Sequence, residues 1–231
     1  MKDKNIIWLY LFLIATLLDL AFLVEGNYES RFFSKPFILL GLIIYFFQLS
    51  KPIRGTLLSK AILGALIFSW IGDILLLWEN LFLYGLGSFL IAQGCYIIGF
   101  KVAQFNPGRI GKVNFVRTFI LNLPIYFSGA FVFYLINLNL GALKIPVAIY
   151  TVVIVMMLTT ARERFRNSSN VSFWQVFIGG CFFLISDALI ALNKFYEYHQ
   201  EWEVLIMGTY AIAQLLIVMG IRTHILNPTK K

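Results

Sequence analysis

Charged residues are scarce in this sequence. Only 13% of its 231 residues are Asp, Glu, Lys or Arg, while 60% are hydrophobic and 17% are aromatic. A soluble domain usually contains about 25% charged and about 45–50% apolar residues. This composition therefore excludes an ordinary soluble domain and indicates an integral membrane protein.

Cysteine and histidine are also scarce, with two residues of each. Cys95 and Cys181 both fall inside apolar stretches, where a free thiol behaves as a small hydrophobic side chain. The sequence contains no Ser-His-Asp arrangement, no glycine-rich phosphate loop and no His/Cys cluster with metal-ligand spacing. We therefore expect no disulfide framework, no metal and no cofactor.

Long apolar stretches dominate the chain instead. A run of about 20 apolar residues can cross a bilayer as a helix. We count eight such stretches, at about 6–24, 34–50, 57–78, 81–101, 116–138, 141–160, 172–192 and 203–222. No small-residue cleavage site follows the first stretch, so we expect it to be retained. The sequence predicts an all-α, polytopic bundle of eight transmembrane helices that forms a single transmembrane domain over 1–231.

The basic residues gather on one side of the predicted spans. Of the 19 Lys and Arg residues, only four fall on the other side: Arg31, Lys35, Lys144 and Lys194. Loops rich in Lys and Arg remain in the cytoplasm, so we expect a multi-pass protein of the cell membrane with both termini cytoplasmic. The same placement accounts for the net charge of +8, and we expect the lipid bilayer, not nucleic acid, as the partner.

Two predicted spans each carry an aspartate in matching surroundings, Asp73 and Asp187. Each follows a Phe by five positions, comes directly after Gly or Ser, and precedes a Leu by two positions. An aspartate in the hydrocarbon region costs at least ~2.5 kcal/mol, so it persists where it faces a cavity or a partner. Each acid could simply hold its helix by a hydrogen bond, but the pair favours one shared functional site.

A further similarity predicts an internal repeat. Spans 81–101 and 203–222 share the spacing Gly, one residue, aromatic, one residue, Ile-Ala-Gln, five residues, Gly, at a constant offset of 121. The two aspartates lie 114 positions apart. We expect the first four spans to be repeated in parallel by the last four, in halves of about 1–105 and 106–231.

A parallel repeat predicts the depth of the polar side chains. Asp73 and Asp187 would face each other in the outer half of the bilayer, each about five residues, or ~7 to 8 Å, below the outer end of its helix. Gln93 and Gln214 would lie near the middle, where they could bind a ligand or simply form hydrogen bonds between helices. Lys35 and Lys144 would lie at the outer rim, where a lysine can also simply extend its ammonium group to the interface.

The chain also carries a series of short motifs in a specific order: Lys35-Pro36, Phe68-Ser69 followed by Gly72-Asp73, Gly87 and Phe89 with Tyr96, Tyr150 with Met156, and Phe183 followed by Ser186-Asp187 with Gln214. This series resembles the YhhN-type lysoplasmalogenase family, over about 33–220. The resemblance implies an eight-span hydrolase that cleaves the vinyl ether bond of lysoplasmalogens. One departure is Gln93, where such proteins often have His ahead of the tyrosine of the fourth span.

Two carboxyls suit this reaction. A vinyl ether is hydrolysed by protonation of its β-carbon, and water then captures the oxocarbenium ion. One aspartate can act as general acid while its ionised partner stabilises the cation and activates water, as in glycoside hydrolysis. The sequence leaves open which aspartate takes which part, and the pair can share one proton.

We assign catalysis to Asp73 and Asp187. The residues expected to bind the lysophospholipid substrate are the other polar side chains of the shared site: Lys35, Gln93, Tyr96, Tyr150, Tyr210, Gln214 and Ser186. The expected products are a fatty aldehyde and glycerophosphoethanolamine or glycerophosphocholine. Two other functions would use the same intramembrane acids, a proton-coupled transporter and a lipid-binding membrane protein without chemistry.

Overall fold

The computed structural model describes residues 6–105 and 115–227. Its long elements are α1 (Ile6–Val24), α2 (Arg31–Leu49), α3 (Leu57–Leu75), α4 (Phe82–Val102), α5 (Phe115–Ile136), α6 (Lys144–Glu163), α7 (Asn170–Phe195) and α8 (Gln200–Leu226). Short 3-10 turns lie in the connections: η1 (Lys51–Ile53), η2 (Glu79–Leu81), η3 (Asn137–Asn139) and η4 (Gly141–Leu143). Within the described ranges, eight helices are long and apolar enough to cross a membrane. This confirms the predicted all-α fold of a multi-pass membrane protein.

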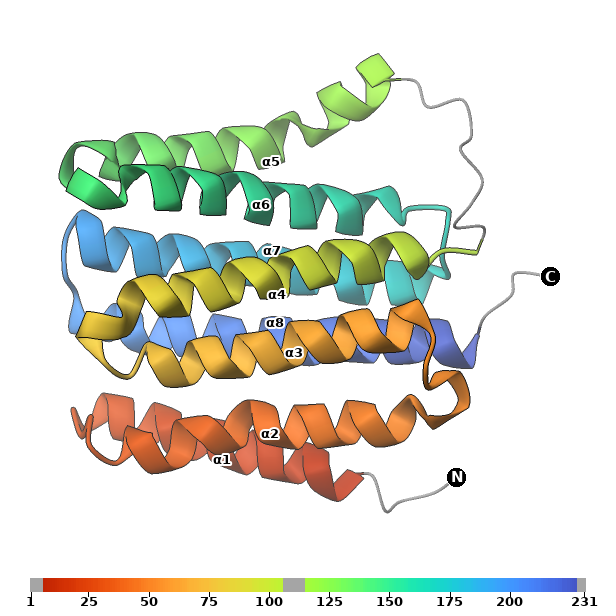
Figure 1. Ribbon diagram of the computed structural model, residues 1–231, viewed down its shortest axis with the longest axis horizontal. Coiled ribbons are helices and arrows are strands. Elements are labelled where there is room, and N and C mark those ends of the chain that lie inside the picture. Colours follow the sequence, from red (N-terminus) through yellow and green to blue (C-terminus); the bar gives the residue numbers. More distant parts are fainter. Residues whose placement is uncertain (1–5, 106–114, 228–231) are drawn as a thin grey trace.

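The helices lie side by side and alternate in direction (Figure 1). Helix α3 packs against α4, and α7 packs against α8; these two pairs form the middle of the bundle. The α1–α2 pair flanks one side and the α5–α6 pair flanks the other. The turns at 25–30, 76–81, 137–143 and 196–199 gather at one end, which we call the turn end. The opposite end, which we call the terminal end, holds both described chain ends (Figure 1).

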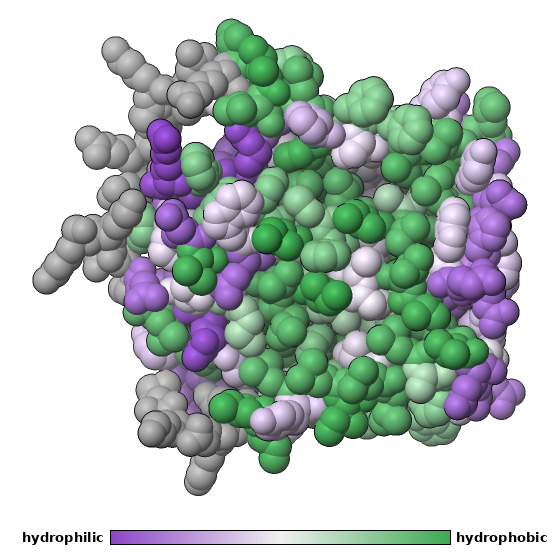
Figure 2. All heavy atoms as spheres, turned by 180° about the vertical axis from the view of Figure 1, so that it is seen from behind, coloured by the Kyte–Doolittle hydropathy of each residue, from purple (hydrophilic) through white to green (hydrophobic). Residues whose placement is uncertain are grey.

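The surface matches a bilayer. Figure 2 shows apolar side chains over the middle of the bundle and polar side chains gathered at both of its ends. A helix in hydrocarbon satisfies its own backbone hydrogen bonds, so long apolar stretches can form stable spans there.

Glycine allows α7 and α8 to approach closely. A Cβ atom at Gly220 would lie 2.5 Å from Cγ2 and 2.9 Å from the backbone nitrogen of Val176. A Cβ atom at Gly179 would lie 3.0 Å from the carbonyl oxygen of Ala213. Small residues permit this kind of close packing between membrane helices. The contact holds α7, which carries Asp187, firmly against α8.

Two helix ends differ from the prediction. Helix α2 begins at Arg31, three residues before the predicted stretch at about 34–50, and Pro36 lies inside it. Helix α3 ends at Leu75, and the next three residues form a turn. Asp73 therefore lies only two residues from the end of its helix, about 3 Å along the axis, which is shallower within the helix than predicted.

The internal repeat stays a prediction. Asp187 lies eight residues before the end of α7 at Phe195, so the two acids are not placed alike relative to the ends of their helices. The predicted boundary between the halves, at 105–106, lies at the edge of the described residues. Six of the basic residues used to predict the topology lie outside the described residues: Lys2, Lys4, Arg109, Lys112, Lys230 and Lys231.

Candidate functional site

A polar cavity of about 400 Å³ lies at the turn end of the bundle. Side chains from α2, α3, η2, α4, α7 and α8 and from the turn before α8 line it. The charged residues among them are Arg31, Lys35, Asp73, Glu79, Asp187, Lys194 and Glu203. The fold therefore places both predicted catalytic acids on the wall of a single cavity, although they come from different halves of the chain.

Asp73 is held near the end of α3 by a tyrosine of α8. Its Oδ2 accepts a 2.8 Å hydrogen bond from the hydroxyl of Tyr210, and the residue is only 4% exposed. Gly72 leaves room for the ring of Phe89, because a Cβ atom there would lie 2.6 Å from the ring atom Cε2. Asp73 accepts no other side-chain hydrogen bond from the described residues, so its carboxyl remains available to a ligand in the cavity.

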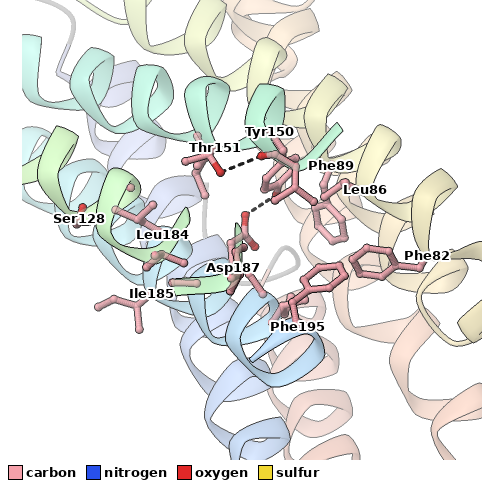
Figure 3. A pocket seen from close by; sticks show the side chains of 18 of the residues that line it. Phe82, Leu86, Phe89, Ser128, Tyr150, Thr151, Leu184, Ile185, Asp187 and Phe195 are labelled. Carbon is pink, nitrogen blue, oxygen red and sulfur yellow. Dashed lines mark hydrogen bonds between the residues drawn. The ribbon is translucent and has the colours of Figure 1, made fainter. Parts of the chain in front are cut away.

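Asp187 borders two cavities at once. It lines the polar cavity and also an apolar cavity of about 170 Å³ between α4, α5, α6 and α7. Tyr150, on the wall of the apolar cavity, donates a hydrogen bond to Asp187 Oδ2 (Figure 3). Four apolar side chains line both cavities together with Asp187: Leu76, Phe82, Phe89 and Ile190. The two cavities therefore meet at this carboxyl.

The apolar cavity is built almost entirely from hydrocarbon. Aromatic side chains of Phe82 and Phe195 lie on one side of Asp187, and Leu184 and Ile185 lie on the other (Figure 3). Helix α5 closes the outer wall with residues between 128 and 136. Such a cavity suits a hydrocarbon chain.

Lys35 faces the polar cavity without an ion-pair partner among the described residues. The residue is 9% exposed, and Asp73 lines the same cavity. A buried charge is costly unless it is paired. The ammonium group of Lys35 is therefore suited to an anionic group that enters the cavity.

The neighbouring cation Arg31 is already neutralised. Its Nη2 lies 3.3 Å from Asp19 Oδ2, and its Nη1 lies 3.3 Å from Glu203 Oε2. The hydroxyl of Ser34 also donates to Asp19 Oδ1 at 2.7 Å. This network joins α1, α2 and α8, and the sequence analysis did not assign it to the site. The sequence does contain one indication of this network, because Asp19 is a third aspartate inside a predicted span.

The remaining candidates are more deeply placed or otherwise engaged. Ser186 lines the polar cavity, but its hydroxyl donates to the carbonyl oxygen of Ile206 at 2.9 Å and so ties α7 to α8. Gln93, Tyr96 and Gln214 are fully buried and line neither of the two cavities. The hydroxyl of Tyr96 donates to Gln214 Oε1.

The site therefore offers the carboxyls of Asp73 and Asp187, the hydroxyls of Tyr150 and Tyr210, and the ammonium groups of Lys35 and Lys194 beside an apolar cavity. Within 6–105 and 115–227, no group of three or more His, Cys, Asp and Glu residues is placed to hold a metal ion. The groups present can transfer protons and can bind an anionic group next to a hydrocarbon chain.

A comparison with protein families decides the classification of the chain. The model of the YhhN family matches residues 30–221. This chain belongs to the YhhN family. The match confirms the family that the motifs indicated, and it includes both aspartates and every predicted binding residue of this YhhN protein.

Curated relatives of this YhhN protein carry the name lysoplasmalogenase. It is 29% identical to Lysoplasmalogenase TMEM86B of Mus musculus over 167 aligned residues. These residues make up 70% of this chain and 66% of that protein. It is 31% identical over 161 residues to Lysoplasmalogenase of Mycobacterium tuberculosis (strain CDC 1551 / Oshkosh), an alignment that covers 68% of this chain and 58% of that protein. For Lysoplasmalogenase TMEM86A of Homo sapiens the identity is 30% over 169 residues, which make up 70% of this chain and 65% of that protein. The chain thus spans 58% to 66% of the length of these relatives, and no solved structure matches it significantly.

Proposed function

We propose that this YhhN protein hydrolyses the vinyl ether bond of lysoplasmalogens. The observation that carries the proposal is the position of Asp187 where the polar and apolar cavities meet, with Asp73 on the polar wall. A lysoplasmalogen carries its vinyl ether between a glycerophospho-headgroup and a hydrocarbon chain, so the bond would lie at this junction. The name lysoplasmalogenase that the relatives share supports the same substrate class.

The two cavities divide the amphiphilic substrate between them. The hydrocarbon chain occupies the apolar cavity, and the headgroup occupies the polar cavity with its phosphate on Lys35. In the most apolar 18 residues of the Thr118–Asn139 span, which includes most of α5, only 22% of the residues are buried within the bundle. Because this helix lines the apolar cavity and is otherwise exposed to lipid, the substrate reaches the site sideways from the bilayer.

Asp187 is the proton donor in this mechanism. The β-carbon of the vinyl ether belongs to the hydrocarbon chain, and of the two acids only Asp187 reaches the apolar cavity. Its proton passes to the β-carbon, which leaves an oxocarbenium ion at the α-carbon. Water attacks this ion from the polar cavity and gives its proton to Asp73, whose carboxylate also stabilises the positive charge. The intermediate is a hemiacetal.

The same two carboxyls then break the hemiacetal down. The carboxylate of Asp187 takes the hydroxyl proton of the hemiacetal, and Asp73 protonates the departing glycerol oxygen. The bond between carbon and that oxygen breaks and releases a fatty aldehyde and glycerophosphoethanolamine or glycerophosphocholine. One water is consumed, and both aspartates return to their initial protonation states.

The orientation in the membrane follows from the positive-inside rule. We place both termini in the cytoplasm, so that the turn end with its polar cavity faces the opposite side of the cell membrane. This orientation supplies the reacting water from the non-cytoplasmic side.

The test is aldehyde release by the detergent-purified protein. We expect lysoplasmenylethanolamine and lysoplasmenylcholine to release one aldehyde per headgroup. The matched 1-acyl lysophospholipids, which lack the vinyl ether, should release none. Catalysis needs no sealed membrane, whereas transport does. Absence of aldehyde in detergent, with proton-dependent uptake into proteoliposomes, would overturn the proposal in favour of a transporter.

A further inference from the structure

Four polar side-chain atoms in the centre of the bundle have no hydrogen-bonding partner among the described residues. They are Ser69 Oγ, Gln93 Oε1, Gln93 Nε2 and Gln214 Nε2. The three side chains come from α3, α4 and α8, and all are 0% exposed. Buried polar groups almost always bond to another protein group or to ordered water. These four atoms therefore indicate a small hydrogen-bonding ligand inside the bundle.

One of the two glutamines lies beside the hydrogen bond that holds Asp187. Tyr150 donates to Asp187 Oδ2 (Figure 3), and the hydroxyl of Tyr150 also lies next to the side chain of Gln93. A tyrosine hydroxyl that donates its proton can still accept a hydrogen bond. The amide of Gln93 makes no direct hydrogen bond with the described residues, so it is placed to support Tyr150 through a water molecule.

The other glutamine is placed in the same way behind Asp73. Tyr210 donates to Asp73 Oδ2 at 2.8 Å, and its hydroxyl lies next to the side chain of Gln214. Gln214 Oε1 accepts a hydrogen bond from Tyr96, whose hydroxyl also lies next to Ser69. Each aspartate thus accepts a hydrogen bond from a tyrosine, and a glutamine lies behind each tyrosine. The amide nitrogen of each glutamine has no hydrogen-bonding partner among the described residues.

Helix α4 brings these two series of residues together. Gln93 and Tyr96 lie three positions apart on this helix, so their side chains project from the same face. Tyr96 is bonded to Gln214 of α8, which places Gln93 and Gln214 on the same side of α4. The ring of Phe183 lies 6.1 Å from the ring of Tyr96 and 5.6 Å from that of Tyr210, and so helps to separate this polar group from lipid.

We propose that ordered water binds between Gln93 and Gln214 and joins the two tyrosine–aspartate pairs into one hydrogen-bonded network. Water suits these atoms because the set contains donors and acceptors, and a water molecule both donates and accepts. The two glutamines are positioning residues, which hold Tyr150 and Tyr210 as donors to the two carboxyls. The water site itself does not depend on the proposed function, whereas its effect on turnover rests on that function.

The water site can be tested without substrate. Radiolysis of bound water produces hydroxyl radicals that label adjacent aromatic rings, which mass spectrometry then locates. Tyr96 is 0% exposed and lines neither cavity, and Phe46, also 0% exposed, is the matched control. We expect Tyr96 to be labelled well above Phe46, and the excess to disappear in the Gln93→Met/Gln214→Met variant. Equal labelling of the two rings in the wild-type protein would overturn the water site.

The network predicts a specific pattern in the kinetics. Methionine keeps the length of glutamine and removes its amide. Gln93→Met and Gln214→Met should each lower kcat about ten-fold, less than the about 10²- to 10⁴-fold expected for a group that transfers the proton itself. KM should not change, because neither side chain lines a cavity. Since both residues act through one network, the double variant should be no slower than the slower single variant. If the double variant were about 100-fold slower, the two losses in kcat would multiply. This result would show two independent sites and contradict the proposal.

A third variant and a combination of results separate the remaining outcomes. Thr16 is buried and bonds only to the carbonyl oxygen of Phe12 in its own helix, so Thr16→Val should leave kcat and the labelling of Tyr96 unchanged. A wild-type protein that releases no aldehyde would overturn the proposed function while the labelling still tests the water site. Normal aldehyde release with unlabelled Tyr96 would overturn the water site alone.

Discussion

The two ends of the bundle differ in how completely their charged groups are satisfied within the protein. At the terminal end, Arg164 follows α6 and is fully buried, and all its guanidinium nitrogens donate hydrogen bonds. Nε donates to the carbonyl oxygen of Ala103 at 3.0 Å, Nη1 to the carbonyl oxygen of Ser172 at 3.2 Å, and Nη2 to Ser172 Oγ at 2.7 Å. Ser172 Oγ in turn donates to the carbonyl oxygen of Gly220 at 2.7 Å. This cation connects α4, α6, α7 and α8.

At the turn end the network of Arg31, Asp19 and Glu203 is also satisfied within the protein, but three charges beside it are only partly satisfied. Asp73 and Asp187 each accept one tyrosine hydrogen bond, and Lys35 makes no ion pair with the described residues. All three line the polar cavity. A buried charge whose bonds are all made within the protein acts as a structural link, whereas one that faces a cavity with bonds to spare can act on a ligand. Stability and activity should therefore depend on different ends of the molecule.

The largest expected effect is on catalysis at the turn end. Asp73→Asn and Asp187→Asn keep the side-chain shape and an oxygen for the tyrosine hydrogen bond but remove the titrating carboxyl. We expect each to lower kcat about 1,000-fold, because a positioned acid or base contributes about 10² to 10⁴. Aldehyde release measures the loss, and thermal unfolding should stay near that of the wild type. Near wild-type turnover in either variant would remove that residue from the mechanism.

The next effect concerns stability at the terminal end. Arg164→Met removes three hydrogen bonds of a charged donor and leaves buried acceptors at Ala103 and Ser172 unpaired. We expect a loss of roughly 3 kcal/mol in the free energy of unfolding, seen as a lower Tm in detergent. Turnover per folded molecule should not change. An unchanged Tm with reduced turnover would reverse the comparison between the two ends.

A smaller effect is expected for Lys35, the buried cation of the polar cavity that forms no ion pair with the described residues. Lys35→Met should raise KM about ten-fold, since one charge-assisted hydrogen bond to phosphate contributes about 1.5–3 kcal/mol. Stability should be maintained, because the change removes a buried charge that has no ion-pair partner. Lys144 is exposed and lines neither cavity, so Lys144→Met is the matched control and should leave KM unchanged. A lowered Tm for Lys35→Met would mark Lys35 as a structural residue like Arg164.

The smallest effect tests the apolar cavity. Ala188 lines this cavity and not the polar one, so Ala188→Leu should narrow it without touching the acids. We expect KM to rise about five-fold for long-chain lysoplasmalogens, since filling a packed apolar site costs about 1 kcal/mol or more. A short-chain substrate is the control and should be less affected. An equal rise for both would place the hydrocarbon chain elsewhere.

The deviations from the predicted helix ends have a physical cause. Helix α2 begins before its apolar stretch because Arg31, which hydropathy assigns to the connection, is buried against Asp19 and Glu203. Those partners come from α1 and α8, and no local pattern in the sequence indicates the pairing. Helix α3 is shorter than its apolar stretch because the stretch continues into the turn at 76–78. Hydropathy thus located each span but not the residues at its ends.

The sequence by itself determined the number and approximate position of the helices and singled out Asp73 and Asp187. Both conclusions follow from the bilayer, which requires backbone hydrogen bonds to be satisfied within each span and makes an unneeded carboxyl costly. Only the tertiary structure decided that Asp187 lies between a polar and an apolar cavity, that Lys35 is left without an ion-pair partner among the described residues, and that Gln93 lies beside Tyr150. Helices that are apolar on all sides carry little information about which faces meet, so these contacts depend on how side chains distant in the sequence pack together.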